Sequence, residues 1–331
     1  MTHHTAHLKV GERYERFFEW MVKLGMDKFQ KLLFPQAVAR AETVTIDESF
    51  QAAISHQNLP LAVQRLAGEM AAAALLSAGA LHYDGTVILQ VAGDGPVRLM
   101  VVEVSPNLVY RVSVVMREQY DPIEDNASMQ SLLNVHGNAQ CSFILDPANR
   151  PQGVEPYRGL VALEGETFAD VMTNYFIHSE QVETLMVLAC DERRAGGIMI
   201  QKMPTQGGKA LPEDYDEDGW NRLKLFVNTV NSEELLTLSP EEINRRLFWE
   251  ENPEVMYEEH PVFRCSCSDE RLYSVIRSLG RDEVDSILEE RDGNIEITCQ
   301  FCGRVRLFTR DDVNEIFATD PLAPQAPQTL S

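Results

Sequence analysis

FRCSCSDE (Phe263–Glu270) and TCQFCGR (Thr298–Arg304) hold four of the six cysteines of this 331-residue chain, as a C-x-C pair and a C-x-x-C pair. Cys265 and Cys267 are two residues apart, so in an extended segment both side chains point to one face. The C-x-x-C pair predicts a tight turn in which two thiols converge and Gly303 relieves the crowded backbone. Two such pairs supply the ligands of a tetrahedral four-thiolate site. We therefore expect one Zn²⁺, bound by Cys265, Cys267, Cys299 and Cys302.

The two pairs lie in a small predicted module, residues 261–319. Its pattern is a cysteine pair, two helices, a strand, the second cysteine pair, a second strand and a last helix. A module of roughly 60 residues with few large apolar side chains often needs a metal ion or disulfides to fold. Binding of zinc contributes on the order of 10 kcal/mol to the folding of such modules. We expect the fold of this module to depend on its ligand.

The same sulfurs have a second chemical state available. Zinc keeps them as thiolates, which is the form that oxidants attack. Two residues along a strand span about 6.6 Å, within the roughly 6.8 Å limit for the Cα atoms of a disulfide, so a bond inside the C-x-C pair is reachable. Oxidation would eject the ion and remove the main stabiliser of the module. The residues alone leave two alternatives, a redox switch and a permanently reduced structural site, and the chemistry alone favours the latter.

Residues 27–204 are predicted to form the main domain, of the α+β class with a mainly antiparallel sheet and packed helices. The expected helices are 47–57, 61–81 and 167–182, with Thr167 as N-cap and Asp170 in the capping-box position. Strands with turns such as GDGP between them are typical of an antiparallel meander. The expected strands are 86–93, 97–105, 108–116, 140–146, 157–165, 184–190 and 196–204.

Residues 205–260 are predicted to form an acidic helical linker. Within 212–260 there are 14 acidic and 4 basic residues, a net charge of −10. Ser239 and Pro240 start a helix well, as N-cap and first helical residue. Short helices of this kind fold only where their apolar face finds a surface. We interpret the segment as a marginally stable linker docked on its neighbours, and an ordinary acidic helical hairpin is the alternative.

The net charge of −22 argues against binding of DNA or RNA through phosphate neutralisation. No secretory signal is visible, and the longest apolar run, Met70–Leu81, is too short to span a membrane. We expect a cytoplasmic protein, in which thiols stay reduced. Cys141 and Cys190 are expected to be buried structural thiols. Residues 1–26 are expected to be an N-terminal extension, and the Pro-rich residues 320–331 a disordered tail.

The chain closely resembles the heat shock protein 33 family of redox-regulated bacterial chaperones. The cysteine quartet carries the resemblance together with five further stretches, namely LQVAGDGPVRLMVV, YRGLVALEGETFAD, YFIHSEQVETLMVLA, RAGGIMIQKMP and SEELLTLSPEEINRRLFWEE. It extends from Asp27 to Ala318 and leaves residues 1–26 outside.

The resemblance implies a holdase chaperone that needs no ATP and is not an enzyme. The reduced form would bind zinc and be inactive. Oxidants would form the disulfides Cys265–Cys267 and Cys299–Cys302, release zinc and unfold the linker, and the oxidised protein, often a homodimer, would bind unfolding client proteins. We add the hypothesis that clients contact the sheet that the released linker uncovers and apolar residues that the linker exposes, namely Trp220, Phe226, Phe248 and Trp249.

Two rival functions remain. A zinc-ribbon nucleic-acid binder would need a basic stripe, whereas residues 261–319 contain 8 Arg and no Lys against 12 acidic residues. A thiol–disulfide oxidoreductase usually has its C-x-x-C at a helix N-terminus, whereas here the pair is predicted between two strands.

Overall fold

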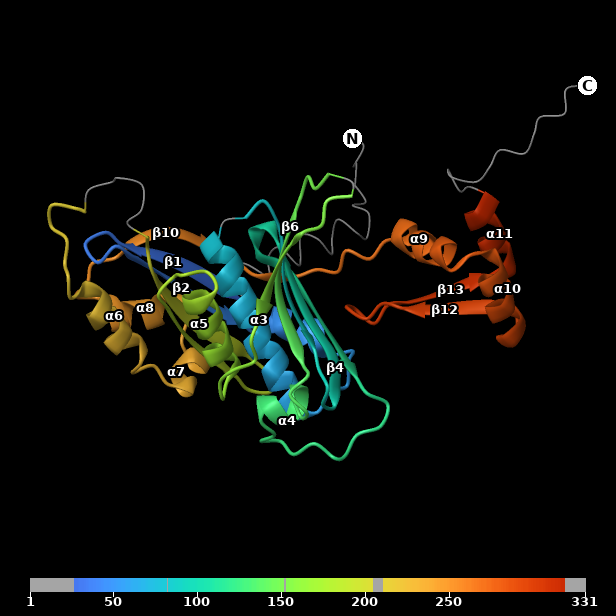
Figure 1. Cartoon of the computed structure of the whole chain (residues 1–331), viewed down its shortest axis with the longest axis horizontal. Helices are drawn as coiled ribbons and strands as arrows, with labels where there is room; N and C mark the ends of the chain where they lie inside the picture. The colour runs from blue at the N-terminus through green and yellow to red at the C-terminus, as the bar shows by residue number, and fades with distance from the viewer. Residues whose placement is uncertain (1–26, 82, 152, 205–210, 319–331) are drawn as a thin grey trace, which may run out of the picture. The chain divides into compact units, whose positions relative to one another are not determined.

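The structure is a computed structural model that describes residues 27–81, 83–151, 153–204 and 211–318. The chain divides into two compact units, with the boundary between Arg264 and Cys265 (Figure 1). The predicted N-terminal extension and C-terminal tail lie outside the described residues.

The larger unit contains two sheets. The first has five antiparallel strands in the order β10-β1-β2-β9-β8. Its strands are β1 (Lys28–Phe34), β2 (Ala39–Ile46), β8 (Thr184–Cys190), β9 (Ala195–Lys202) and β10 (Glu254–Glu259). The prediction that residues 205–260 form only helices is wrong for β10, which pairs with the outer edge of β1. Pairing satisfies backbone groups that this edge would otherwise present, a tertiary requirement that overrides the local pattern.

The second sheet has six strands in the order β11-β5-β4-β3-β6-β7. The pairs are antiparallel apart from β11, which runs parallel to β5. The predicted meander is confirmed as β3-β4-β5. The strands are β3 (Gly85–Ala92), β4 (Val97–Ser105), β5 (Val109–Met116), β6 (Gln140–Pro147), β7 (Tyr157–Val161) and β11 (Val262–Phe263).

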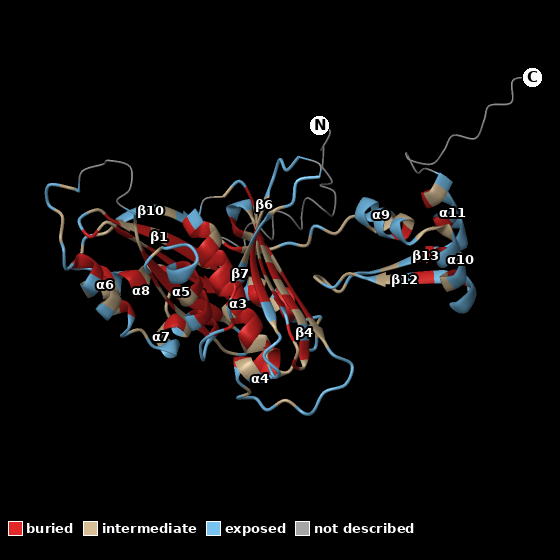
Figure 2. Ribbon diagram, in the orientation of Figure 1, coloured by how far each residue is buried: buried red, intermediate tan, exposed pale blue. Residues whose placement is uncertain are grey.

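Helix α3 (Leu61–Leu81) lies between the two sheets and is buried over most of its length (Figure 2). Its Ala- and Leu-rich sequence lets both sheets approach closely, and one apolar cluster joins α3 to residues of both sheets. Smaller helices complete this unit, namely α2 (Glu48–Ile54), α4 (Met129–Leu133), α5 (Phe168–His178) and the 3-10 turn η1 (Pro106–Leu108). The predicted Thr167–Asp170 capping box is present at α5. None of the helices in the described ranges is both long and apolar enough to cross a membrane.

Three helices of the predicted linker pack on the other face of the five-stranded sheet, away from α3. They are α6 (Gly219–Val227), α7 (Ser232–Thr237) and α8 (Pro240–Phe248). Ser239 is the N-cap of α8 and Pro240 its first residue, as predicted. Trp220, Leu223 and Ile243 meet Ile198 and Ile200 of β9 in a second apolar cluster. The five-stranded sheet is therefore covered on both faces.

The smaller unit has the element order that the sequence predicted: α9 (Asp269–Leu279), α10 (Arg281–Glu290), β12 (Asn294–Thr298), β13 (Val305–Thr309) and α11 (Arg310–Ala318). Strands β12 and β13 form an antiparallel hairpin. Its core consists of Ile276, Val284, Leu288, Ile295, Phe308, Val313 and Ile316. The α+β class is confirmed for the whole chain.

Candidate metal centre

Two segments of the smaller unit position the four cysteines. Cys265 and Cys267 lie in the irregular segment before α9, whose N-cap Ser268 accepts a hydrogen bond from the Arg271 backbone N–H. Cys299 and Cys302 lie in the turn between β12 and β13. In this turn the Gly303 N–H donates to the Cys299 carbonyl at 2.8 Å. Gly303 has φ +67°, which confirms that glycine serves the tight turn.

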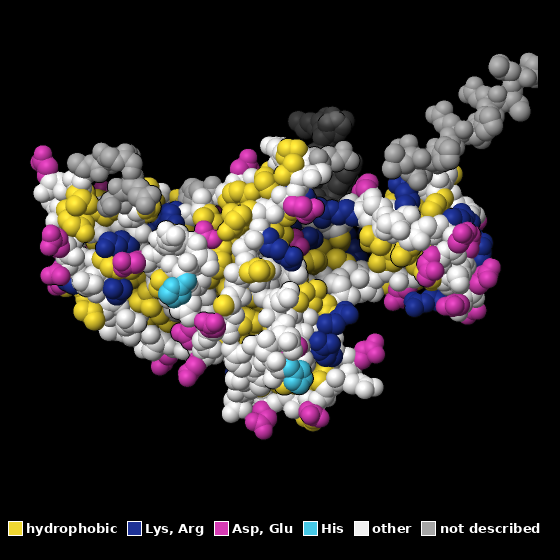
Figure 3. Space-filling model, viewed as in Figure 1, with side chains coloured by type: hydrophobic (Ala, Val, Ile, Leu, Met, Phe, Trp, Pro, Cys, Tyr) yellow, Lys and Arg dark blue, Asp and Glu magenta, His cyan; other side chains and the backbone are white. Residues whose placement is uncertain are grey.

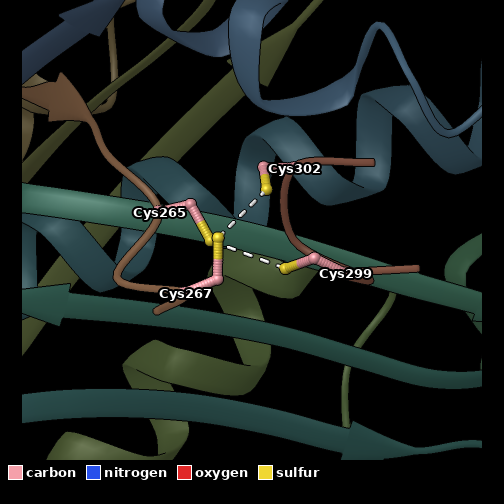
Figure 4. A group of neighbouring side chains, drawn as sticks. All are labelled: Cys265, Cys267, Cys299 and Cys302. Carbon is pink, nitrogen blue, oxygen red and sulfur yellow. Dashed lines mark hydrogen bonds between the residues drawn. The ribbon is translucent and has the colours of Figure 1, made fainter. Parts of the chain in front are cut away.

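All four thiols point toward one centre (Figure 4). The Sγ atoms of Cys265 and Cys299 are 3.6 Å apart, as are those of Cys267 and Cys302. All four sulfurs lie within 4.8 Å of one another. The cysteines are free thiols, because a disulfide would bring two sulfurs to about 2.05 Å.

The thiols influence one another's ionisation. For Cys265, burial favours the neutral thiol, but hydrogen bonds from the Cys267 backbone N–H and the neighbouring thiols outweigh it and lower the pKa. For Cys302, burial and, to a smaller extent, hydrogen bonds with the other thiols raise the pKa to about 12, against the opposing hydrogen bond from the Arg304 backbone N–H. Burial also raises the pKa of Cys267. One thiolate is thus favoured at the expense of the others, and a divalent cation would relieve this conflict.

The sulfur positions fit a tetrahedral ion. Four ligands at a Zn–S distance of about 2.3 Å lie about 3.8 Å from one another. The pairs Cys265–Cys299 and Cys267–Cys302, each with sulfurs 3.6 Å apart, are near this value. Cys265, Cys267, Cys299 and Cys302 form the one cluster of potential metal-binding side chains found in the described part of the chain. Its donor set of four soft sulfurs suits zinc.

The other two cysteines lie in the larger unit. Cys141 on β6 is buried, as predicted, and burial raises its pKa to about 12. Cys190, at the end of β8, is half-buried and packs against the main apolar cluster, so the prediction of a buried thiol holds only in part for this residue. Its thiol donates to the Asp191 carbonyl, and burial, followed by the charge of Glu69, raises its pKa. Both thiols are therefore held in the neutral, unreactive form.

The four aromatic residues proposed to contact clients differ in their surroundings. Trp220 and Phe248 are buried against the five-stranded sheet, and Phe226 is half-buried beside them. The Trp220 indole N–H donates to Glu183 Oε2 at 2.6 Å. Trp249 is already 68% exposed, at the rim of a shallow hollow of about 200 Å³. The expectation that release of the linker would expose all four is therefore wrong for Trp249, which follows the last buried residue of α8.

Two residues that hold the linker on the sheet were missed by the sequence reasoning. Asn244 of α8 is buried, accepts from Thr43 Oγ1 at 2.7 Å and donates to Gln30 Oε1 at 2.8 Å. Gly196 of β9 lets α7 approach, since a Cβ there would lie 2.5 Å from the Leu235 carbonyl oxygen. The available signals were an Asn on the apolar face of α8, one turn before Phe248, and a Gly-Gly pair inside a strand.

Comparison with known proteins agrees with this geometry. A sequence model described as Hsp33 protein matches residues 27–309. A 33 kDa chaperonin of Methylobacillus flagellatus is 36% identical over 299 residues, which cover 90% of this chain and 97% of the relative. A 33 kDa chaperonin of Chromobacterium violaceum is 34% identical over 297 residues, which cover 90% and 96%.

A solved structure shares the fold. The crystal structure of a 33 kDa chaperonin from Thermotoga maritima superposes with a TM-score of 0.71, at 18% identity, and covers 89% of this chain and 98% of that one. At this identity the likeness concerns the fold alone. The sequence matches extend over most of the chain at more than 30% identity, and on these grounds the chain belongs to the Hsp33 family.

Proposed function

We propose that this protein is a cytoplasmic, redox-regulated holdase chaperone that works without ATP. The observation that carries the proposal is the cluster of four thiols within 4.8 Å, in a unit whose core has seven buried apolar side chains among residues 265–318. Such a unit depends on the ion that its thiols bind. The names of the relatives, 33 kDa chaperonin, support the chaperone role.

In the reduced form, Cys265, Cys267, Cys299 and Cys302 would hold Zn²⁺ as thiolates, and the ion would supply the cross-link that folds the unit. Oxidation would form the pairs Cys265–Cys267 and Cys299–Cys302. For each pair, two thiolates lose two electrons and become one disulfide, while hypochlorous acid takes up the electrons and becomes chloride and hydroxide. No thiolate then remains to hold the ion, and zinc leaves.

Loss of the folded unit would release the linker. Support comes from residues 212–260, where α6, α7 and α8 bury apolar side chains while the segment as a whole carries 14 acidic and 4 basic residues. Acidic side chains lie at the surface around α6 in Figure 3. Release would uncover Ile198 and Ile200 of the sheet together with Trp220 and Phe248 of the linker. Clients would bind there, and the negative charge of the linker would keep the open form, a homodimer when oxidised, in solution.

One titration tests the proposal. Hypochlorite is added stepwise to the reduced protein while a chromogenic chelator reports zinc and light scattering reports aggregation of a heated client. We expect zinc release and suppression of aggregation to rise together, at one zinc per chain. Zinc release without suppression would sink the chaperone function, and absence of both would leave a purely structural site. Cys141→Ala is the matched control and should behave like the wild type.

A second variant separates the linker from the metal. Gly196→Val places a side chain against the backbone of α7 without touching the cysteines. We expect the reduced variant to suppress aggregation while it still holds zinc, because the linker can no longer pack. Glu233→Ala, on the exposed side of α7, is the control. A zinc-loaded Gly196→Val protein with a displaced linker and no activity would argue against the linker as the cover of the client site.

A further inference from the structure

We infer that β1 is a docking edge for client chains, and that β10 covers this edge in the reduced protein. Once β10 leaves with the linker, an extended client segment would pair with β1 as a new antiparallel strand. The inference rests on the proposed function, because β10 belongs to the segment whose release activates the chaperone. It adds a binding mode through backbone hydrogen bonds to the apolar contacts proposed above.

Strand β10 is attached mainly through its backbone. It pairs with β1 from Phe29↔Glu259 to Leu33↔Glu254, with a bulge at Met256. Val255 and Met256 are more than half exposed, and four of the six side chains of β10 are classed as exposed. Few buried side chains would have to be given up when it leaves, so this strand is the least costly part of the sheet to detach.

The two strands differ in how they behave as edges. β10, with the sequence EVMYEE, presents three glutamates, and charged side chains on an edge strand discourage pairing with other chains. β1, with the sequence KFQKLLF, has no acidic residue and no proline and is rich in apolar side chains. On its inner side it keeps seven residue pairs with β2. An exposed β1 would therefore remain a formed strand with an open, apolar edge.

The side-chain contacts that β10 makes with β1 indicate which client residues the β1 edge would accept. Tyr257 packs on one face of the sheet, with its ring centroid 5.5 Å from that of Phe29. Val255 lies on the same hollow as Leu32, which stays in the sheet when the linker leaves. One aromatic and one aliphatic contact, joined by backbone hydrogen bonds, make few demands on sequence. Strand addition of this kind takes its affinity from the main chain, which suits a protein that must bind many unrelated clients.

Charge favours a client over a second copy of this chain. The β1 strand carries two lysines and no acidic residue, so pairing of β1 with the β1 of a second copy would place cationic side chains of both copies along one edge, wherever else two copies meet. Lys28 loses its partner when the linker leaves, because Glu241 of α8, at 2.9 Å, departs with it. An apolar or weakly acidic client segment meets none of these penalties.

Hydrogen exchange measured by mass spectrometry tests the inference on the full-length protein. The reduced form, the hypochlorite-oxidised form and the oxidised form with reduced and alkylated lactalbumin are compared over residues 28–34. We expect exchange to speed up on oxidation and to slow again with the unfolded chain. Residues 157–161, the edge strand at the other end of the six-stranded sheet, should show no such reversal.

The outcomes separate the two proposals. If lactalbumin co-elutes with the oxidised protein while β1 keeps exchanging fast, the docking edge is wrong and the chaperone function stands. If β1 slows when the oxidised protein is merely concentrated, the occupant is a second copy and the inference is overturned. If no unfolded chain binds and aggregation is not suppressed, the proposed function fails together with the inference.

A peptide competitor provides a second test. The peptide NPEVMYEEH (Asn252–His260) should displace lactalbumin from the oxidised protein at millimolar concentration, the range that a tether supplies. Glu258 and Glu259 are adjacent in the ladder, so only one of their two amides faces β1. We expect N-methylation of one of these amides to abolish competition and of the other to preserve it. Equal competition by both methylated peptides would exclude strand pairing.

Discussion

The two units are built from the same kinds of elements, helices and antiparallel strands, but their apolar cores differ greatly in size. Among the described residues, the cluster around α3 joins more than 40 buried side chains from two sheets and several helices. The core of the smaller unit has seven. The larger core is of the kind on which single domains fold by burial of apolar surface, whereas units as small as the second commonly need a metal ion or disulfides, for which the cysteine cluster is the candidate.

The packing of the linker is intermediate between that of the two units. Its helices share a cluster with one face of the five-stranded sheet, so their apolar residues are buried only while they are docked. The same sheet is fixed on its other face by α3. In the proposed mechanism one sheet therefore has a permanent cover, α3, and a removable one, the linker. This arrangement is what a protein needs if it is to expose apolar surface without unfolding.

The largest expected effect is the loss of metal from the smaller unit. Chelation of zinc, or the variant Cys299→Ser, should unfold residues 265–318, because the ion contributes on the order of 10 kcal/mol. The larger unit should keep its melting temperature. Backbone NMR signals of α9, α10 and α11 report the first effect, and calorimetry reports the second. A smaller unit that stays folded after complete removal of zinc would contradict the comparison of the two cores.

We expect the free energy of unfolding of the larger unit to change by about 3 kcal/mol with pH. Burial raises the pKa of Glu42 from 4.5 to about 7, although Arg40 and Lys31 oppose the shift. Between these values the folded protein holds a proton that the unfolded chain has released. The free energy of unfolding should therefore be highest below pH 4.5 as far as Glu42 is concerned, and should fall by about 3 kcal/mol as the pH rises to about 7.

Glu42→Gln stays neutral and should flatten this part of the pH profile in urea unfolding. Some slope should remain, because burial also raises the pKa of Glu69 to about 7. The exposed Glu164→Gln is the control and should keep the wild-type profile. Identical profiles for Glu42→Gln and the wild type would mean that Glu42 stays ionised beside Lys31, at 3.5 Å, and Arg40, at 3.7 Å.

The sequence predicted local structure better than long-range pairing. Its order of helices and strands in the smaller unit is confirmed, because each element there has a cap or a turn of its own. β1 and β2 were not identified, because both faces of their sheet are covered and their sequences do not alternate. β10 was missed because its strand form depends on the β1 edge, more than 200 residues away.

The candidate site shows the same difference between local features, which the sequence predicted, and long-range contacts, which it did not. The spacing of the four cysteines was enough to predict their meeting, since both pairs lie in short segments of one unit. The residues that hold the linker could not be found in this way. Asn244 acquires its role from Thr43 and Gln30, and Gly196 acquires its role from α7. Only the fold brings these partners together.

Removal of one buried amide should loosen the linker by about 1–3 kcal/mol. Asn244→Ala removes the acceptor of the Thr43 hydroxyl and the donor to Gln30 Oε1 inside the interface, while Gln30 Nε2 keeps Glu258. We expect faster hydrogen exchange in α8 and a lower dose of oxidant for activation. The adjacent Arg245→Ala, on the exposed side, is the control. Unchanged exchange in α8 would show that apolar contacts alone hold this helix.

The smallest effect compares two helix caps of the same chemistry. Ser239 caps α8 in the linker and Ser268 caps α9 in the smaller unit, each accepting an N–H three residues on at 3.3 Å. Each serine to alanine change should cost about 1 kcal/mol, a factor of about five in an equilibrium constant.

In Ser239→Ala this factor should appear directly as faster hydrogen exchange in α7 and α8, because we expect the linker to be only marginally stable. In zinc-loaded Ser268→Ala, exchange in α9 should stay close to that of the wild type, because the metal contributes most of the stability of this unit. The roughly fivefold change should become measurable only when a chelator competes for the ion. If both caps mattered equally in the zinc-loaded protein, the linker would be no less stable than the metal-bound unit, and its role as the removable cover would be lost.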